Sequence, residues 1–322
     1  MENPKILLLA AGRRYSFVKL LQEHGLDVYS YELDKRCPIH HICETYIGNS
    51  HSYPIQIHDI NRIIEKNNIQ LVLPMNDYWS AHASSVFTKY KDSFTEVVSS
   101  ESRAAHVCYD KKEFDKVMMA SPYSINYPTY RPFFDSIAKP QYGNSSIGLV
   151  HIPWYDVLTQ YRYRLSKDFV VQRKIDQRVE VSVDAYFNKS SKFIGGVPRT
   201  RDRVAGGEVV DSTVIPFGNK EAKDLLYLTE KIGEHIGLKG PTCFQFMKDQ
   251  SPGYIAEQSE WKLFEINARF GGGCTLTIRS GFDMIQMMIN EYIYNKDINN
   301  YRDFPYTGLT MKRVFNDTFT VT

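Results

Sequence analysis

The segment from Trp261 to Gly273 carries the side chains best suited to chemistry, in the order Trp-Lys-Leu-Phe-Glu-Ile-Asn-Ala-Arg-Phe-Gly-Gly-Gly. Its first half has the character of a strand, and residues two apart on a strand share a face. Glu265, Asn267 and Arg269 are therefore predicted to point the same way. Carboxylate and carboxamide oxygens suit Mg²⁺, and a guanidinium keeps its positive charge. The row predicts a place where a metal ion and a phosphate group meet.

A loop of small residues is a second candidate for phosphate binding. It covers residues 140–148 and follows a predicted strand, 133–139, that ends with Lys139. Small residues let backbone N–H groups approach phosphate oxygens, and the lysine adds a positive charge. The P-loop pattern G-x-x-x-x-G-K-[ST] is absent. By itself the loop does not distinguish a phosphate site from an ordinary turn.

Strands and helices alternate through the first hundred residues. Strands are predicted at 5–10, 28–33 and 69–73, and helices follow the first and precede the third. This rhythm indicates a parallel, doubly wound sheet, whose ligands gather beyond the carboxyl ends of its strands. The residues predicted at those ends, as ligand contacts or as turn and cap residues, are Gly12, Arg13, Asp34, Asn76 and Asp77. The absence of G-x-G-x-x-G argues against a dehydrogenase.

The remaining chain predicts mixed α and β structure. One helix is expected over 102–120, and residues 121–175 form a small α+β module with strands at 133–139 and 168–175 and a helix near 154–163. Strands then follow at 181–187, 193–197, 209–215, 242–247 and 262–267. Helices are expected from Leu225 to Gly237 and over 282–294.

Composition limits the class of protein. The chain has 322 residues, 43% hydrophobic and 24% charged, with a net charge of +2, so neither a nucleic-acid surface nor a membrane span is indicated. Five scattered cysteines indicate reduced thiols in a cytoplasmic protein. Cys37 and Cys43 flank two histidines, but no second ligand pair at matching spacing supports zinc.

In their order along the chain, the motifs resemble the ATP-grasp superfamily, most closely its branch related to the large chain of carbamoyl-phosphate synthase. The resemblance runs from the first strand to about Asp283. It rests on Asn76-Asp77, Asp110-Lys111, Ile137–Pro140 with the loop Gly143–Gly148, Val170–Ile175 with Glu180, Val197–Arg201 with Gly206-Gly207-Glu208, and Gln245 with Glu265–Arg269. It implies a pre-ATP-grasp doubly wound domain at 1–105, a linker and lid at 106–175, and an antiparallel core at 176–322.

The resemblance also implies roles for individual residues. Gln245, Glu265 and Asn267 would hold Mg²⁺ or Mn²⁺, Arg269 the γ-phosphoryl group, and Arg199 or Arg201 an acyl phosphate. ATP would be bound by Lys111, Lys139, Gly143, Ser145 and Ser146 at the phosphates, by Gln172, Arg173, Lys174 and Ile175 at the adenine, and by Glu180 at the ribose. Arg173 departs from the glutamate usual in the family, so either a backbone carbonyl accepts from the adenine amino group or the choice of nucleotide is relaxed.

The function implied is a Mg²⁺- and ATP-dependent carboxylate–amine ligase of small molecules that passes through an acyl phosphate, with a homodimer as one form of assembly. Two alternatives remain: an enzyme of the carbamoyl-phosphate or kinase type, using ammonia or no amine, and a nucleotide-binding partner subunit without turnover. Each motif also has a structural explanation, for example Glu265 paired with Arg279, or Arg199 and Arg201 on an exposed strand. Residues 141–148 are expected to be disordered without nucleotide.

Overall fold

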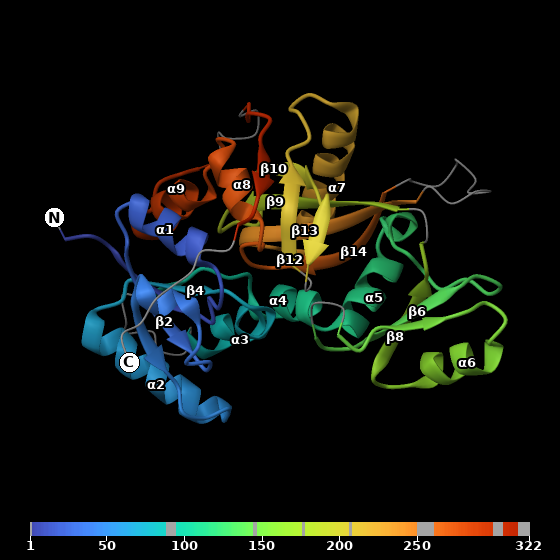
Figure 1. The fold of residues 1–322 in the computed structure, drawn as a ribbon, viewed down its shortest axis with the longest axis horizontal. Helices are drawn as coiled ribbons and strands as arrows, with labels where there is room; N and C mark the ends of the chain where they lie inside the picture. The colour runs from blue at the N-terminus through green and yellow to red at the C-terminus, as the bar shows by residue number, and fades with distance from the viewer. Residues whose placement is uncertain are drawn as a thin grey trace.

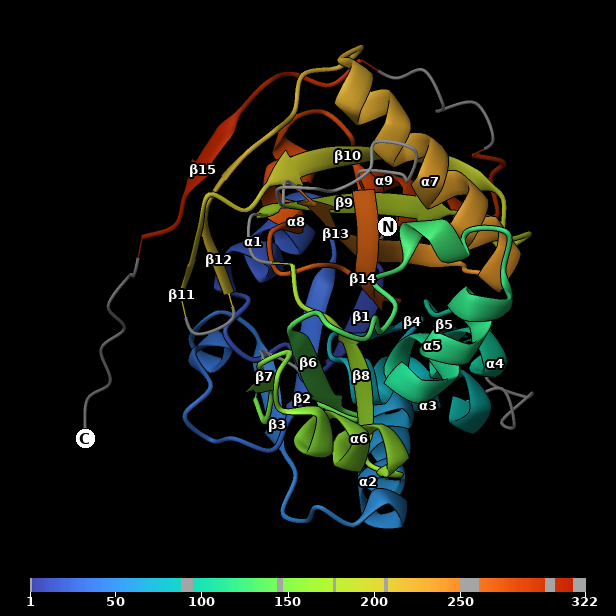
Figure 2. The same ribbon diagram turned by 90° about the vertical axis from the view of Figure 1, so that its right-hand side faces the viewer.

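The computed structural model describes residues 2–87, 95–143, 147–175, 178–205, 208–249, 261–298 and 305–314. Its first part is a sheet of five parallel strands in the order β3-β2-β1-β4-β5 (Figures 1 and 2). The strands are β1 (Lys5–Leu9), β2 (Asp27–Glu32), β3 (Glu44–Ile47), β4 (Leu71–Pro74) and β5 (Glu96–Val97). Strands β3 and β5 are additions to the predicted set.

Alternation along β1 explains why both faces of this sheet are covered. Ile6 and Leu8 pack with α1 (Tyr15–Glu23) on one face, and Leu7 and Leu9 pack with α2 (Tyr53–Asn67) and α3 (Asp77–Phe87) on the other. A strand buried on both faces requires apolar residues at every position. The predicted doubly wound parallel sheet is confirmed.

The single helix predicted over 102–120 is wrong. The structure has two helices, α4 (Ser102–Tyr109) and α5 (Lys111–Ala120), separated by Asp110 in an extended conformation. The Asp110 carboxylate accepts hydrogen bonds from the backbone N–H groups of Lys112 at 2.8 Å and Glu113 at 3.2 Å. An aspartate that caps a helix start satisfies donors that have no partner inside the helix, so a new helix begins here.

The predicted α+β module is present as a three-stranded antiparallel sheet with one helix. The order is β7-β6-β8, with β6 (Ser136–Pro140), β7 (Val150–Ile152), β8 (Phe169–Arg173) and α6 (Val157–Leu165). The short helix η2 (Ser124–Asn126) precedes it. In Figure 1 this module lies at the right of the molecule, next to α5. The domain boundaries 1–105, 106–175 and 176–322 stay a prediction.

The second half of the chain forms an antiparallel sheet in the order β10-β9-β13-β14, covered on one face by α7 (Lys220–Ile236). Its strands are β9 (Arg178–Phe187), β10 (Phe193–Thr200), β13 (Gly240–Asp249) and β14 (Trp261–Asn267). A smaller sheet joins β11 (Arg203–Ala205), β12 (Glu208–Thr213) and β15 (Thr310–Lys312). Strand β15 had no counterpart among the predicted elements.

The closing helix predicted over 282–294 is present, but it changes from α to π geometry along its length and is preceded by another helix. The described elements are α8 (Cys274–Arg279), α9 (Met284–Met288) and a π-helical turn, η3 (Ile289–Ile293). Their apolar side chains share a core with α1, so the last segments pack against the first sheet. Within the described part of the chain, no helix has both the length and the apolar character that a bilayer crossing requires.

Candidate active site

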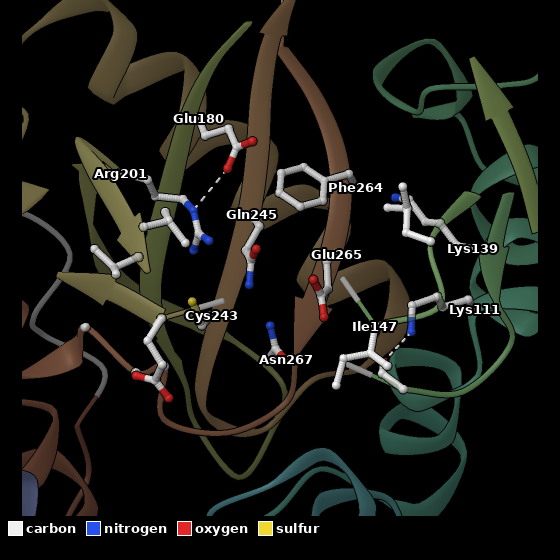
Figure 3. Close-up of a pocket in the computed structure, with 18 of the residues that line it drawn as sticks. Lys111, Lys139, Ile147, Glu180, Arg201, Cys243, Gln245, Phe264, Glu265 and Asn267 are labelled. Atoms are coloured by element: carbon white, nitrogen blue, oxygen red, sulfur yellow. Dashed lines mark hydrogen bonds and ion pairs between the residues drawn. The ribbon is translucent and has the colours of Figure 1, made fainter. Parts of the chain in front are cut away.

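A pocket of about 900 Å³ opens where the three parts of the chain meet. It is lined by the turn after β1, by the three-stranded module of β6, β7 and β8, and by strands β9, β10, β13 and β14. Figure 3 shows Glu180 and Arg201 on one side, Lys111, Lys139 and Ile147 on the opposite side, and Gln245, Glu265 and Asn267 between them. The structure therefore brings together groups that lie far apart along the chain.

Strand pairing places the predicted metal ligands side by side. Gln245 of β13 lies opposite Glu265 of β14, and Cys243 lies opposite Asn267. Directly opposed residues of antiparallel strands have neighbouring side chains. All four line the pocket, with the Glu265 carboxylate between Gln245 and the lysines of the lid side (Figure 3).

A β-bulge at Phe264 decides which residues of β14 face the pocket. The register passes from Gln245 opposite Glu265 to Phe246 opposite Leu263, so Phe264 is the extra residue. Phe264 and Glu265 both line the pocket, while Leu263 and Ile266 enter the core under α7. A bulge of this kind re-aims side chains that strict alternation would place elsewhere.

The positive charges around Glu265 do not fully offset the cost of burying its carboxylate. Burial raises its pKa above the ordinary value and nearby Asp77 raises it further, while Lys111, Lys139 and Arg269 act in the opposite direction. The structural alternative of a pair with Arg279 is wrong, because Arg279 bonds to Glu23 on the surface. A bound divalent cation would supply the missing positive charge, so the donor set fits Mg²⁺.

The prediction that Arg269 shares a strand face with Glu265 and Asn267 is wrong, because Arg269 is not part of the strand. Strand β14 ends at Asn267, and Arg269 reaches back instead. Its guanidinium bonds Asp77 at 2.7 and 3.0 Å and the Asn267 side-chain oxygen at 3.0 Å. The three predicted residues still meet in one pocket, but α3 and its Asp77 orient the arginine. Asn76 caps the start of α3 by accepting from the backbone of Trp79.

The structural alternative of an exposed Arg199 is wrong. Its side chain is 1% exposed and bonds Asp184 of β9 through Nε at 2.7 Å and Nη2 at 3.3 Å. Asp184 also accepts from the Thr277 hydroxyl at 2.7 Å. The Nη1 atom of Arg199 is buried and has no hydrogen-bond partner among the described residues. Arg199 lines the pocket, and so does Gly273, against which Nη1 lies, so this donor is next to the space that a bound oxyanion would occupy.

The glycine run after β14 is explained by this ion pair. A Cβ atom on Gly273 would lie 2.6 Å from Cζ of Arg199, and one on Gly271 would lie 2.6 Å from Oδ1 of Asp184. Real Cβ atoms do not approach so closely, so the turn must pass over the buried pair without side chains.

We therefore expect Gly273→Ala to lower the free energy of unfolding by about 1–3 kcal/mol, the cost typical of overpacking a well-packed site. Arg199 cannot retreat without weakening its bonds to Asp184. Urea unfolding measures the effect, with Gly308→Ala as the control because a Cβ there meets nothing within 4 Å. Equal stability of the two variants would contradict this account of the glycine.

Arg201 and Glu180 form an ion pair at the predicted ribose side of the pocket. The Nε atom of Arg201 lies 3.2 Å from Oε2 of Glu180, and both side chains line the pocket (Figure 3). A carboxylate accepts several hydrogen bonds at once, so the pair leaves Glu180 able to accept from hydroxyl groups. The arginine fixes the direction in which the carboxylate points.

The loop after β6, predicted to act as a lid, is tied to the start of α5. Lys111 Nζ donates to the Gly143 carbonyl at 2.6 Å, and Asp110 accepts from Gln141 at 2.6 Å and from the Tyr142 hydroxyl at 2.9 Å. Burial raises the pKa of Asp110, but these hydrogen bonds and those of the helix cap outweigh it and hold the pKa below its ordinary value. Lys139 lies over the Phe264 ring, 5.4 Å from its centre.

Two predicted phosphate contacts, Ser145 and Ser146, lie outside the described residues, and so does the centre of the loop for which disorder was expected. Gly206 and Gly207, which follow β11, also lie outside the described residues. Lys111, Lys139 and Gly143 all line the pocket. The predicted phosphate side is therefore represented by its two lysines and one glycine.

The predicted adenine segment contributes three of its four residues to the pocket. Gln172, Arg173 and Ile175 line it, and Lys174 does not; its backbone N–H donates to the Asp135 carbonyl at 2.7 Å. Gln172 is buried and donates to the Tyr127 hydroxyl. The Arg173 guanidinium lies 5.6 Å from the centre of the Phe134 ring.

A buried lysine next to this segment gives a pH-dependent prediction. Burial lowers the pKa of Lys262 to about 8, and the charges of Arg131 and Arg173 add to the effect, from a value of 10.5 for the free side chain. Lys262 donates to the Ile125 carbonyl. Between these two pKa values the unfolded chain binds a proton that the folded chain has lost, so this group makes stability rise with pH.

We expect the stability gained by Lys262→Met relative to the native chain to be largest below pH 8 and to shrink as the pH approaches 10.5. Urea unfolding of both proteins across this range isolates the lysine from the tyrosines and cysteines that titrate in the same window. Lys223→Met, at an exposed position of α7, serves as the control. A difference that stays constant with pH would show that Lys262 is not perturbed.

Several residues were missed as members of the site by the sequence analysis. Four of them line the pocket: Arg14, Glu208, Cys243 and Phe264. Two others support residues that line it: Asp184 bonds Arg199, and Arg313 donates to Glu208 and to the Gly272 carbonyl. For Asp184 a signal was available: Glu180, Ser182 and Asp184 alternate with valines along β9, which is the pattern of a strand with one polar face. Arg14 and Arg313 had no comparable local signal.

Comparison with known proteins agrees with this architecture. Residues 166–311 match the model of a family described as ATP-grasp in the biosynthetic pathway with Ter operon. A search of curated protein sequences finds no match.

Solved structures with the same fold include the biotin carboxylase domain of the Hydrogenobacter thermophilus 2-oxoglutarate carboxylase, with MgADP, ADP and bicarbonate bound (TM-score 0.71, 11% identity, 95% of this chain and 73% of that chain). Others are the Staphylococcus aureus N5-carboxyaminoimidazole synthetase with ADP (0.67, 12%, 97% and 82%) and the Bacillus licheniformis L-amino acid ligase (0.66, 12%, 94% and 78%). At such identities the likeness shows the fold alone.

Proposed function

We propose that this chain, a member of the ATP-grasp superfamily, is an ATP- and Mg²⁺-dependent ligase that joins a carboxylate to an amine. One observation carries the proposal: oxygen donors on β13 and β14, the Arg269 guanidinium and two lid lysines line a single pocket. The side-chain oxygens on β13 and β14 suit a divalent metal ion, and the positively charged side chains around them suit a triphosphate.

The proposed reaction has two steps. A carboxylate oxygen of the acid attacks the γ-phosphorus of ATP, the bond to the β-phosphate oxygen breaks, and an acyl phosphate and ADP are formed. The amine nitrogen then attacks the acyl carbon, phosphate leaves with the bonding electrons, and the nitrogen loses a proton. Charge moves onto oxygen in both steps, so fixed donors that surround those oxygens lower the barrier.

The described residues divide this work. Arg269, held by Asp77, would contact the γ-phosphoryl group. The Nη1 atom of Arg199, which has no partner in the part of the chain that the structure describes, would donate to an acyl-phosphate oxygen. Lys111 and Lys139 would neutralise phosphate oxygens, with Lys111 exchanging its bond to the Gly143 carbonyl for one to phosphate. Gln245, Glu265 and Asn267 would hold Mg²⁺, which supplies positive charge against the triphosphate.

The lid would exclude water from the acyl phosphate, which water would otherwise hydrolyse. The bonds of Asp110 and Lys111 to residues 141–143 give the lid a fixed point from which to close. At the base-binding side, Arg173 cannot accept from an adenine amino group, so the selectivity for adenine would come from backbone carbonyls or be relaxed.

ADP release tests the reaction class. The protein is incubated with Mg²⁺ and ATP, small carboxylates and a mixture of ammonia and amino acids, each omitted in turn. A ligase releases ADP only when acid and amine are both present, or gives a short burst with acid alone. Sustained release with acid alone would identify a kinase, and ATP binding by calorimetry without release for any pair would identify a non-catalytic subunit.

A further inference from the structure

The pocket holds more positive charge than the nucleotide site uses. Among the described residues, eight cationic side chains line it against three carboxylates: Arg13, Arg14, Lys111, Lys139, Arg173, Arg199, Arg201 and Arg269 against Glu180, Glu208 and Glu265. Magnesium bound with the triphosphate cancels much of its negative charge. The nucleotide therefore does not account for the full set of cations.

Pairing within the protein neutralises only part of this charge. Asp77 pairs with Arg269, Asp184 with Arg199 and Glu180 with Arg201. Glu208 is bonded by Arg313, which comes from the C-terminal segment. These pairs account for Arg199 of β10, for Arg201 just after it and for Arg269 just after β14. The turn after β1 contributes Arg13 and Arg14 in addition.

Arg14 lacks a carboxylate partner among the described residues. Its Nη1 donates to the backbone carbonyls of Phe270 at 2.7 Å and Gly271 at 3.4 Å. Burial, followed by the charge of Arg269, lowers its pKa to about 10. The carboxylates of Glu208 and Asp77 act in the opposite direction, but they are already bonded to Arg313 and Arg269. A guanidinium held beside another cation in a partly buried position is unfavourable unless an anion joins it.

The turn that carries Arg14 is held in place. Gly12, at φ +63°, donates from its backbone to the buried Glu32 carboxylate at 3.2 Å, and the Cys37 thiol donates to the Gly12 carbonyl at 2.6 Å. Glu32 is itself bonded by the Ser30 hydroxyl at 2.8 Å. The guanidinium is thus presented by a supported backbone.

We propose that the acid activated by this protein carries a second negatively charged group, and that Arg14 binds that group. Nη1 of Arg199, which is buried and has no partner among the described residues, lies against the same glycine turn that accepts from Arg14, so a second guanidinium is close to this side of the pocket. Dicarboxylates and phosphorylated carboxylic acids share the required chemistry. The inference rests on the proposed ligase function, since it concerns the acid that the ligase would use.

The test compares paired acids that differ in one charge: succinate with butyrate, glutamate with glutamine, and phosphoglycerate with glycerate. ADP release is measured with each acid in the presence of the amine mixture. Thermal stability is measured with each acid and MgADP, because binding to the folded state raises stability without turnover. We expect the charged member of at least one pair to give the lower KM and the larger thermal shift, and the pair that responds identifies the kind of anion.

Arg14→Gln should abolish this preference and raise the KM for the charged acid about tenfold or more, the effect of losing a hydrogen bond to a charged group. Its affinity for MgATP should not change. Arg279→Gln, which removes an exposed guanidinium outside the pocket, is the matched control. Arg14→Lys keeps the charge but not the geometry and should retain part of the preference, so the test survives if Arg14→Gln does not fold.

The outcomes separate the two proposals. Equal use of both members of every pair, or a preference that persists in Arg14→Gln, overturns the role of Arg14 and leaves the ligase function standing. MgATP binding with neither ADP release nor a thermal shift for any acid overturns the ligase function and this inference with it.

Discussion

Glu265→Gln is expected to lower the rate of ADP release about a hundredfold or more, because substituting a residue that only supports a metal ligand already costs about ten- to a hundredfold. The substitution keeps the size of the side chain and removes the carboxylate that lies opposite Gln245 and faces the lid lysines. The same change should weaken the dependence of nucleotide affinity on Mg²⁺, which calorimetry with and without Mg²⁺ measures.

Glu221→Gln is the matched control, since Glu221 pairs with Lys248 and does not line the pocket. It should behave like the native protein in both measurements. Burial raises the pKa of Glu265, so the substitution removes an unfavourable buried charge and should not destabilise the metal-free protein. Full activity in Glu265→Gln would show that the metal site lies elsewhere.

Asp184→Asn is expected to lower the free energy of unfolding by about 3–5 kcal/mol, the cost of leaving one partner of a buried ion pair alone. Asp184 is fully buried, and Arg199 is its partner at 1% exposure. The same carboxylate accepts from Thr277, so the amide would lose part of a network as well as a charge. Denaturant unfolding gives the value directly.

The double variant Asp184→Leu with Arg199→Met separates stability from activity. Replacing both charges by apolar groups is often neutral for stability. We expect recovery of most of the lost stability without recovery of ADP release, because the Nη1 donor is gone. As a control for the stability measurements, a substitution that breaks the exposed pair of Glu23 and Arg279 should lower the free energy of unfolding by about 1 kcal/mol or less. A double variant with native activity would limit Arg199 to a structural role.

The bulge at Phe264 shows where strand patterning stops being informative. The spacing of Glu265 and Asn267 correctly predicts a shared face, since both line the pocket. Strict alternation would also place Leu263 there, yet Leu263 is in the core. The extra residue arises from pairing with β13, and pairing between strands depends on packing over both faces of the sheet rather than on the sequence of one strand.

The sequence alone determined the alternation that builds a parallel sheet buried on both faces, the chemical types of the donors, and the order of motifs that resembles the superfamily. These are local properties, because they follow from side-chain periodicity and from the chemistry of single residues. Tertiary structure decided which charges meet. Arg269 pairs with Asp77 across 192 positions and Arg14 reaches Phe270 across 256. Contacts between such distant residues exist only once the sheets have packed together, since no local propensity encodes them.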